Sequence, residues 1–272
     1  MIANTPLAEF FWQHGRCDEC PVIDMHGHMG PYSMIYFPRA NAESMLHSMD
    51  QCGVRMLVFS HHTALNCPDI GNTLSIKAVR EYPDRLRAYM VVHPSHPEMI
   101  EHDLATYDEY SDVYVGLKFF SSYWQIPWDA PVFESAWHFA NERKLLVLGH
   151  TWGGSIYDGE AQVRKIASLY PNVRLILGHS LHGAWDEAVA IADEFPNLYL
   201  DLTSLTYVRG AVERFVAEGF SERILFGTDL PWFKPHQCIG ALLSADITDD
   251  DRHNILHRNA RQLLHGAGVD IH

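Results

Sequence analysis

Val22-Ile-Asp-Met-His26-Gly-His28 is an apolar run that ends in two histidines separated by one residue. Residues i and i+2 of a β-strand point to the same face, so both imidazoles are directed towards one point, where a divalent metal can bind. Three later strand-like segments also end in a residue that can bind a metal. They are 145–150, ending in His150, 173–179, ending in His179, and 224–229, ending in Asp229. Together the four segments predict a metal site built from several strand ends.

The strand-like segments are continuous apolar runs rather than alternating patterns. Runs of this kind are typical of parallel strands that are covered by helices. We expect eight strands, at 21–28, 54–62, 86–93, 114–120, 145–150, 173–179, 198–203 and 224–229. Helical patterns lie between them at 42–51, 72–82, 132–143, 161–169, 186–195 and 211–217, and a closing helix is expected within 247–266.

Eight strand–helix units in 272 residues predict an α/β fold of the (β/α)8 TIM-barrel type. An open doubly wound sheet is the alternative, but we find no Gly-x-Gly-x-x-Gly after a predicted strand to support it. We expect one barrel domain over residues 1–272, which includes a short N-terminal extension at 1–20. The candidate ligands then all lie at C-terminal strand ends, where barrel enzymes build their active sites.

Composition limits the expected partners and location. The chain has 20 Lys and Arg against 34 Asp and Glu, a formal charge of −14, so we expect neither nucleic acid nor a membrane as partner. The first residues lack the basic start and apolar stretch of a secretory signal. Five scattered cysteines do not suggest a disulfide framework and favour the cytoplasm. Cys17 and Cys20 have metal-knuckle spacing, but no second Cys-x-x-Cys completes a four-sulfur site.

The predicted ligands suit a catalytic metal. Imidazole and carboxylate donors are typical of sites for zinc and related divalent ions, and manganese would accept them too. Four residues are expected to hold one ion, for which zinc is the first choice: His26, His28, His150 and Asp229. Water bound to such an ion becomes a nucleophile near neutral pH, and Asp229 could accept its proton as general base. His179, on the next strand, would bind a second ion or polarise the substrate.

Lys118 lies within the predicted fourth strand, where an unpaired ammonium group would be costly to bury. Carbamylation by carbon dioxide would turn it into an anionic bridge between two metal ions. Alternatively, a plain ammonium group would pair with a ligand carboxylate or with a substrate anion. Both possibilities stay open at this point.

Other side chains at strand ends are expected to contact a small-molecule substrate. His61 and His62 end the second predicted strand, and one of them should face the barrel opening; we assign this role to His61. Aromatic and imidazole side chains just beyond four later strands are expected to line a pocket: Tyr123, Trp152, His182 and Trp232. Asp24 is expected to bond to neighbouring backbone rather than to bind the metal.

A set of motifs resembles those of the amidohydrolase superfamily: Asp24-x-His26-x-His28, Gly116-Leu-Lys118, Gly149-His150, Leu177-Gly-His179-Ser180 and Phe226-Gly-Thr-Asp229-x-Pro231. The resemblance is closer to the amidohydrolase-related branch, or amidohydrolase 2, which includes aminocarboxymuconate-semialdehyde decarboxylase. It runs from about residue 20 to residue 264. It implies a metal-dependent barrel enzyme that uses the four ligands above. His179 would be the catalytic histidine of one-metal members or a ligand in two-metal ones, and Lys118 matches the bridging lysine of dinuclear members.

The resemblance does not choose the reaction, because the branch contains hydrolases, lactonases, decarboxylases and hydratases. Our first expectation is a hydrolase that attacks a small lactone, ester or amide with metal-activated water. The alternative is a zinc-dependent, non-oxidative decarboxylase of a small unsaturated or aromatic acid, in which His179 handles the proton. A third possibility is a barrel that has lost catalysis and acts in binding or assembly. Barrels of this type often form homodimers, so a dimer is possible.

Overall fold

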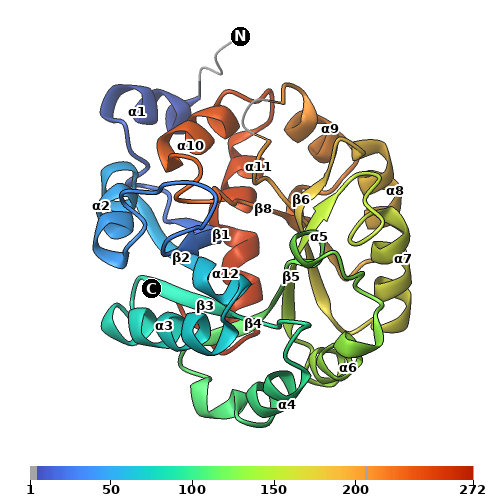
Figure 1. Ribbon diagram of the computed structural model, residues 1–272. Helices are drawn as coiled ribbons and strands as arrows, with labels where there is room; N and C mark the ends of the chain where they lie inside the picture. Colours follow the sequence, from blue (N-terminus) through green and yellow to red (C-terminus); the bar gives the residue numbers. More distant parts are fainter. Residues whose placement is uncertain (1–4, 206–207, 272) are drawn as a thin grey trace.

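The apolar runs form eight β-strands in the computed structural model, which describes residues 5–205 and 208–271. Each strand is parallel to the next one along the chain, so the sheet order is β1 to β8 without a crossover. Helices surround the strands in Figure 1. The strands are β1 (Val22–Met29), β2 (Val54–His61), β3 (Leu86–Val91), β4 (Tyr114–Phe119), β5 (Leu146–Trp152), β6 (Arg174–His182), β7 (Leu198–Asp201) and β8 (Ile224–Leu225). This is the expected (β/α)8 TIM barrel.

Helices lie between the strands and beyond both ends of the sheet. They are α1 (Pro6–His14), α2 (Ala42–Cys52), α3 (Pro68–Glu81), α4 (Pro97–Ala105), α5 (Ser121–Trp124), α6 (Glu134–Arg143), α7 (Glu160–Leu169), α8 (Trp185–Glu194), α9 (Ala211–Ala217), α10 (Pro235–Leu243), α11 (Asp249–His253) and α12 (Asn259–His265). The π-helical turn η5 (Asn254–Arg258) joins α11 to α12. The sequence reasoning did not predict α1, α4, α5 or α10. The expected closing helix is therefore three consecutive helical segments.

Two apolar clusters fill the barrel and its surroundings. One is formed by strand residues that face the barrel interior, such as Ile23, Met25 and Ile176, and it includes Leu263 and Leu264 of α12. The larger cluster joins the outer faces of the strands to the surrounding helices. Residues of α12 therefore close the barrel interior, and the strands are buried on both faces. This burial explains why their sequences are continuous apolar runs.

The barrel is nearly closed between β8 and β1 by main-chain contacts that extend beyond β8. The N–H of Met25 donates to the carbonyl of Phe226 at 2.9 Å, and the N–H of His28 donates to that of Leu230 at 2.6 Å. Gly27 and Leu230 form an isolated parallel bridge. The predicted strand 224–229 is therefore too long, because only Ile224 and Leu225 belong to the ladder with β7. The residues that follow turn towards β1 instead.

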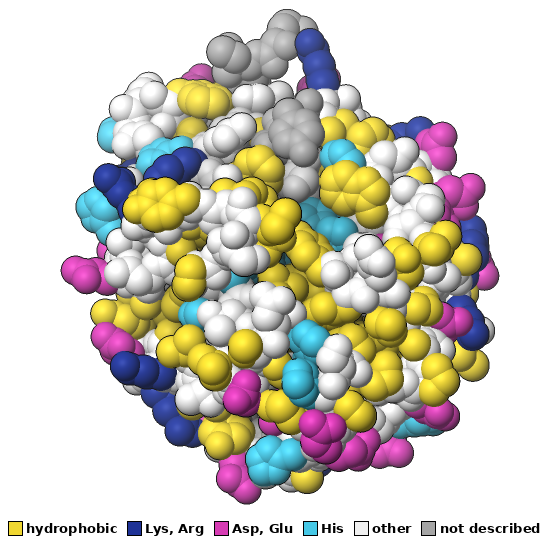
Figure 2. All heavy atoms as spheres, in the orientation of Figure 1, with side chains coloured by type: hydrophobic (Ala, Val, Ile, Leu, Met, Phe, Trp, Pro, Cys, Tyr) yellow, Lys and Arg dark blue, Asp and Glu magenta, His cyan; other side chains and the backbone are white. Residues whose placement is uncertain are grey.

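The loops at the C-terminal ends of the strands carry exposed apolar side chains. Met34 and Tyr36, between β1 and α2, are 79% and 87% exposed, and Ile156, between β5 and α7, is 71% exposed. Figure 2 shows hydrophobic side chains gathered over the middle of one face and charged side chains mainly around its edge. No helix in the described part of the chain is long and apolar enough to cross a membrane.

We expect Gly116→Ala to lower the free energy of unfolding by about 1–3 kcal/mol, the usual cost of overpacking a core. A Cβ at Gly116 would meet the carbonyl oxygen of Leu146, its partner on β5, and this main-chain atom cannot rotate away. Urea unfolding of the two proteins tests the prediction. The matched control is Gly240→Ala in α10, where the added Cβ meets the flexible side chain of Trp12 at 3.2 Å and alanine favours the helix. Equal midpoints for Gly116→Ala and the parent chain would contradict it.

Candidate active site

The irregularity in β1 determines which of its residues face the site. Two residues lie between Asp24 and Gly27, whereas their partners Leu57 and Phe59 on β2 are separated by only one. This one-residue bulge interrupts the alternation of side chains between the two faces of the strand. Met25 packs in the interior cluster and His26 also faces inward. The carboxylate of Asp24 instead accepts hydrogen bonds from the N–H of His26 and from Thr228, in agreement with the backbone-bonding role expected for it.

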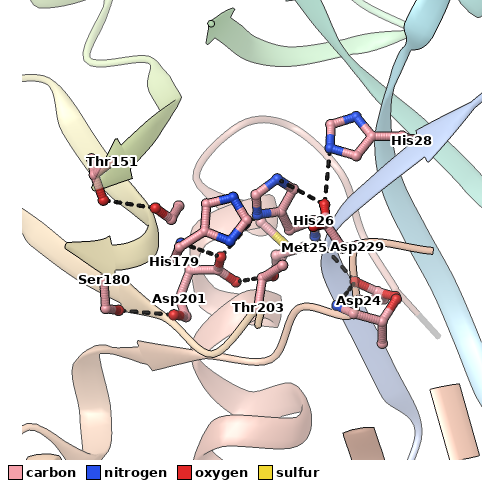
Figure 3. A network of polar contacts seen from close by, with 12 residues as sticks. Asp24, Met25, His26, His28, Thr151, His179, Ser180, Asp201, Thr203 and Asp229 are labelled. Atoms are coloured by element: carbon pink, nitrogen blue, oxygen red, sulfur yellow. Dashed lines mark hydrogen bonds and ion pairs between the residues drawn. The ribbon is translucent and has the colours of Figure 1, made fainter. Parts of the chain in front are cut away.

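His26, His28 and Asp229 form a compact group of possible metal ligands. One donor atom from each lies within 4.8 Å of the other two, and all three residues are buried. Asp229 Oδ1 lies 3.0 Å from Nε2 of His28 and 3.6 Å from Nε2 of His26 (Figure 3). Asp229 reaches this position in the left-handed backbone conformation, with φ of 61°, and its N–H donates to the carbonyl of His26 at 2.8 Å. The turn after β8 thus brings the carboxylate to the histidines of β1.

The remaining nitrogen of each histidine is held by a neighbour. Nδ1 of His26 lies 2.8 Å from Oδ2 of Asp201, and Nδ1 of His28 lies 3.1 Å from the hydroxyl of Ser60. A carboxylate partner requires the proton of His26 to be on Nδ1, which leaves Nε2 as the electron-pair donor. Sequence reasoning missed Asp201 as a site residue. The sequence pattern could have indicated it, because the apolar segment Leu198-Tyr-Leu-Asp201 also ends in a carboxylate.

The charges of this group match a divalent cation. Burial lowers the pKa values of His26 and His28, so both rings are neutral and able to donate electron pairs. Burial opposes ionisation of Asp229, but the contact with His28 and the nearby rings of His26 and His179 hold the pKa of its carboxyl below the usual range. Asp229 Oδ1 is buried and faces the Nε2 atoms of both His28 and His26. Two imidazoles and a buried carboxylate oxygen directed at one point are a donor set that fits a divalent metal ion.

His150 lies close to these ligands but outside the three-residue group. The centroid of its ring is 4.8 Å from that of His179, and its Nδ1 lies 3.1 Å from the carboxylate of Asp158. His150 is therefore oriented by Asp158 in the same manner as His26 is oriented by Asp201. Its role as a fourth ligand stays a prediction.

His179 is positioned by an unusual stretch of backbone. His179, Ser180 and Leu181 all have positive φ values, of 68°, 48° and 52°. Such conformations are uncommon for residues other than glycine and concentrate at functional sites. The stretch is held by hydrogen bonds (Figure 3): the N–H of His179 donates to Asp201 Oδ2 at 3.0 Å, and the hydroxyl of Ser180 donates to the Asp201 carbonyl at 2.8 Å. The N–H of Leu181 donates to Thr151 at 2.9 Å.

Asp201 therefore fixes His26 through its side chain and His179 through the backbone. The ring centroids of these two histidines are 5.2 Å apart. Burial lowers the pKa of His179, so its ring is neutral, and its Nδ1 has no hydrogen-bond partner among the described residues. The His179 ring is thus available to a substrate, whereas the His26 ring is fixed by its neighbours.

Lys118 is fully buried at the same place. Its Nζ lies 3.1 Å from Nε2 of His26 and 4.7 Å above the ring of Phe120. Burial lowers the pKa of the ammonium group to about 8, although the nearby carboxylates of Asp229 and Asp201 oppose this change. The structure thus places Lys118 beside the candidate metal ligand His26, where it can act either as a cation or, after carbamylation, as an anionic ligand.

These residues line a cavity of about 160 Å³, large enough for a small molecule. Its described walls are mostly aromatic or imidazole rings, and Lys118 is the only Lys or Arg among the described lining residues. The lining consists of His26, His28, Tyr32, His62, Leu65, Lys118, Phe120, Tyr123, His150, Trp152, His179, Ser204, Asp229, Trp232 and Phe233. Of the predicted contact residues, Tyr123, Trp152 and Trp232 line the cavity. Tyr32 and Phe233 were missed, because loops bring them in and no strand end marks them.

The structure places two of the predicted contact residues outside the cavity lining. His61 does not line the cavity; its Nδ1 instead accepts a hydrogen bond from the N–H of Thr63. The next residue, His62, faces the cavity, because the chain leaves β2 in a 3-10 turn after His61. His182 also lies outside the lining, with its ring 4.4 Å from that of Trp152. It supports a wall of the cavity from behind.

A family model described as amidohydrolase matches residues 23–266. There is no significant match among the curated proteins. An uncharacterised TIM-barrel protein from Bordetella bronchiseptica is similar to this structure with a TM-score of 0.76 and 18% identity, over 91% of this chain and 99% of that one.

Several of the similar solved structures are decarboxylases. A dihydroxybenzoic acid decarboxylase from Polaromonas sp. JS666, with bound manganese and the inhibitor 2-nitroresorcinol, has a TM-score of 0.73 and 15% identity, over 90% of this chain and 97% of that one. A 5-carboxyvanillate decarboxylase from Sphingomonas paucimobilis has a TM-score of 0.71 and 13% identity, over 90% and 99%. At these identities the likeness shows a shared fold. The family match covers nearly all of the barrel, and the chain therefore belongs to the amidohydrolase family.

Proposed function

We propose that this protein is a metal-dependent decarboxylase that removes carbon dioxide from a small aromatic or unsaturated carboxylic acid without oxidation. The observation that carries the proposal is the His26–His28–Asp229 ligand group in a cavity whose described lining is mostly aromatic or imidazole and includes Lys118. Aromatic walls suit a planar ring, and the positive charges of a bound metal ion and of Lys118 suit the carboxylate of that ring. The similar decarboxylase structures support this choice over hydrolysis, which was our first expectation.

The metal ligands and Lys118 would orient the acid. A divalent ion held by His26, His28 and Asp229 would supply the positive charge that binds the substrate's oxygens and stabilises negative charge developing as carbon dioxide leaves. The Lys118 ammonium group lies beside this group and would pair with the same anion. The walls would exclude water and hold the ring by stacking, since aromatic pairs add about 0.5–1.5 kcal/mol beyond buried area. Zinc and manganese both fit these donors.

Decarboxylation must replace the carboxyl group by a proton on the same carbon. We assign this proton transfer to the ring of His179, which lines the cavity and whose Nδ1 has no partner in the described part of the chain. Asp201 holds the backbone of His179 in place. The proton would come from solvent before each turnover, because the resting ring is neutral.

We expect His179→Gln to lower turnover by about 10²–10⁴-fold, the usual contribution of a positioned acid or base. Metal content should stay at the parent value, because His179 does not belong to the three-ligand group. Steady-state assays combined with elemental analysis test both statements. Loss of one metal equivalent would instead assign His179 to metal binding.

The reaction itself is tested with two substrate panels. The first contains aromatic acids, including 2,6-dihydroxybenzoate and 5-carboxyvanillate, and the second contains lactones, esters and amides. We expect carbon dioxide release from the first panel in the presence of Zn²⁺ or Mn²⁺. In deuterated water the product should carry one deuterium at the carbon that lost the carboxyl group. Hydrolysis of the second panel, with oxygen from labelled water in the product and no carbon dioxide from the first, would overturn the proposal.

A further inference from the structure

A second group of possible metal ligands lies far from the cavity. Cys20, His253 and His257 each place one donor atom within 4.8 Å of the other two. Cys20 precedes β1, whereas His26 and His28 lie near the C-terminal end of the same strand. Six residues at ~3.3 Å each separate Cys20 from His26 by roughly 20 Å. The two groups therefore lie towards opposite ends of the barrel.

Chain segments distant in sequence meet at this second group. His253 is the last residue of α11 and His257 lies in the π-helical turn η5, so the cluster joins the start of the chain to its C-terminal helices. Single π-helical turns within α-helices are rare and often occur at functional sites. Nδ1 of His253 lies 3.2 Å from Nε2 of His257. The turn thus presents two imidazoles together to the buried Cys20.

Hydrogen bonding within the protein does not satisfy this group. Nδ1 of His257 is buried and has no hydrogen-bond partner among the residues that the structure describes. A buried polar atom without a partner costs about 1–3 kcal/mol and calls for an explanation such as an ion. A thiolate and two imidazoles are a donor set of zinc sites.

The size of the group also suits a metal. Zn–S bonds of about 2.3 Å and Zn–N bonds of about 2.0 Å place tetrahedral ligands roughly 3.3–3.6 Å apart. Donor atoms within 4.8 Å of one another would need to approach by about 1 Å, which side-chain rotation can supply. The two histidines are partly exposed, so water could take the fourth position.

We propose that Cys20, His253 and His257 bind a divalent metal ion of the zinc type, at a structural site separate from the catalytic one. Binding would release the thiol proton of Cys20 to solvent. The ion would fasten the segment before β1 to the helices that close the barrel. Because it would bind only the folded chain, it would raise stability.

The experiment is a titration of the metal-free chain with Co²⁺, followed by absorption and by equilibrium dialysis. Of the two metal-ligand groups, only the one with Cys20 contains a thiol. A thiolate-to-cobalt charge-transfer band therefore distinguishes this site from the catalytic one. The parent chain should bind two equivalents and show this band. Cys20→Ser should bind one equivalent without the band, whereas His26→Ala should bind one equivalent and keep it. These opposite outcomes separate the structural site from the catalytic one.

Two further variants complete the design. Cys238→Ser removes another buried cysteine and should keep both equivalents and the band. His257→Gln changes a partly exposed residue, so it provides a second test if Cys20→Ser does not fold; it should lose the band and about one equivalent. It should also lose the rise in melting temperature that Zn²⁺ gives the parent chain. Absence of the band in the parent chain, or its persistence in Cys20→Ser or His257→Gln, would overturn the proposal without affecting the proposed decarboxylase.

Discussion

His26→Ala is expected to remove the metal from the cavity and to lower turnover by at least ~10³-fold, since a catalytic metal contributes several kcal/mol of transition-state stabilisation. His26 Nε2 faces Asp229, and Asp201 fixes the ring through Nδ1. Alanine removes both contacts and leaves a ligand pair that binds a metal far more weakly. Metal content by elemental analysis and turnover on a substrate found in the panels test the expectation.

A matched control uses another buried histidine. His93 is 7% exposed and lies outside the cavity, where its Nε2 contacts the carbonyl of Leu65 at 2.9 Å. His93→Ala should lower the melting temperature but keep the metal and the turnover per folded molecule. If His26→Ala kept its turnover, the assignment of the site would be wrong.

Asp201→Asn has the second largest expected effect, a weakening of metal affinity by about 10–100-fold, as for other residues that orient a metal-binding histidine. Oδ2 of Asp201 contacts both His26 Nδ1 and the N–H of His179. An amide nitrogen in place of Oδ2 would face both donors and repel them, and an amide oxygen there would hold His26 without a negative charge. Turnover should fall more than metal affinity does, because the backbone of His179 depends on the same carboxylate.

Asp24→Asn is the control for this substitution. Both aspartates are fully buried, but burial raises the pKa of Asp24 to about 8 and that of Asp201 only to about 6. The neutral fraction at a given pH is therefore larger for Asp24 than for Asp201, so asparagine is the closer substitute for Asp24. Asp24→Asn should bind metal as the parent chain does. Equal metal affinity in Asp201→Asn and Asp24→Asn, measured by competition with a chelator, would contradict the positioning role of Asp201.

The strand ends were the most informative part of the sequence. Five of the eight strands begin at the predicted residue and the other three begin one residue later, and the ligand candidates all lie at or just beyond C-terminal strand ends. Burial on both faces explains this success, because a fully covered parallel strand must be apolar until it reaches the edge of the sheet. The first polar residue after such a run is then conspicuous. By the same argument Asp201 could have been recognised.

The positions of individual side chains could not be predicted in the same way. Strict alternation would place Asp24 on the same face as His26, but the bulge in β1 separates them. The choice of His62 over His61 depends on the turn that follows β2. Positive φ values at His179 and Asp229 depend on hydrogen bonds to residues far away in sequence.

The sequence by itself determined the barrel, the family and the types of residue that surround a metal, because apolar periodicity and strand-end chemistry are local properties of the chain. Tertiary structure alone decided which of these residues meet. Closure of the barrel brings Asp229 against β1 from a distance of two hundred residues, and the C-terminal turn brings His253 and His257 to Cys20. Such contacts depend on how whole helices and strands pack against one another. The relative position and orientation of these elements cannot be read from any short segment of the sequence.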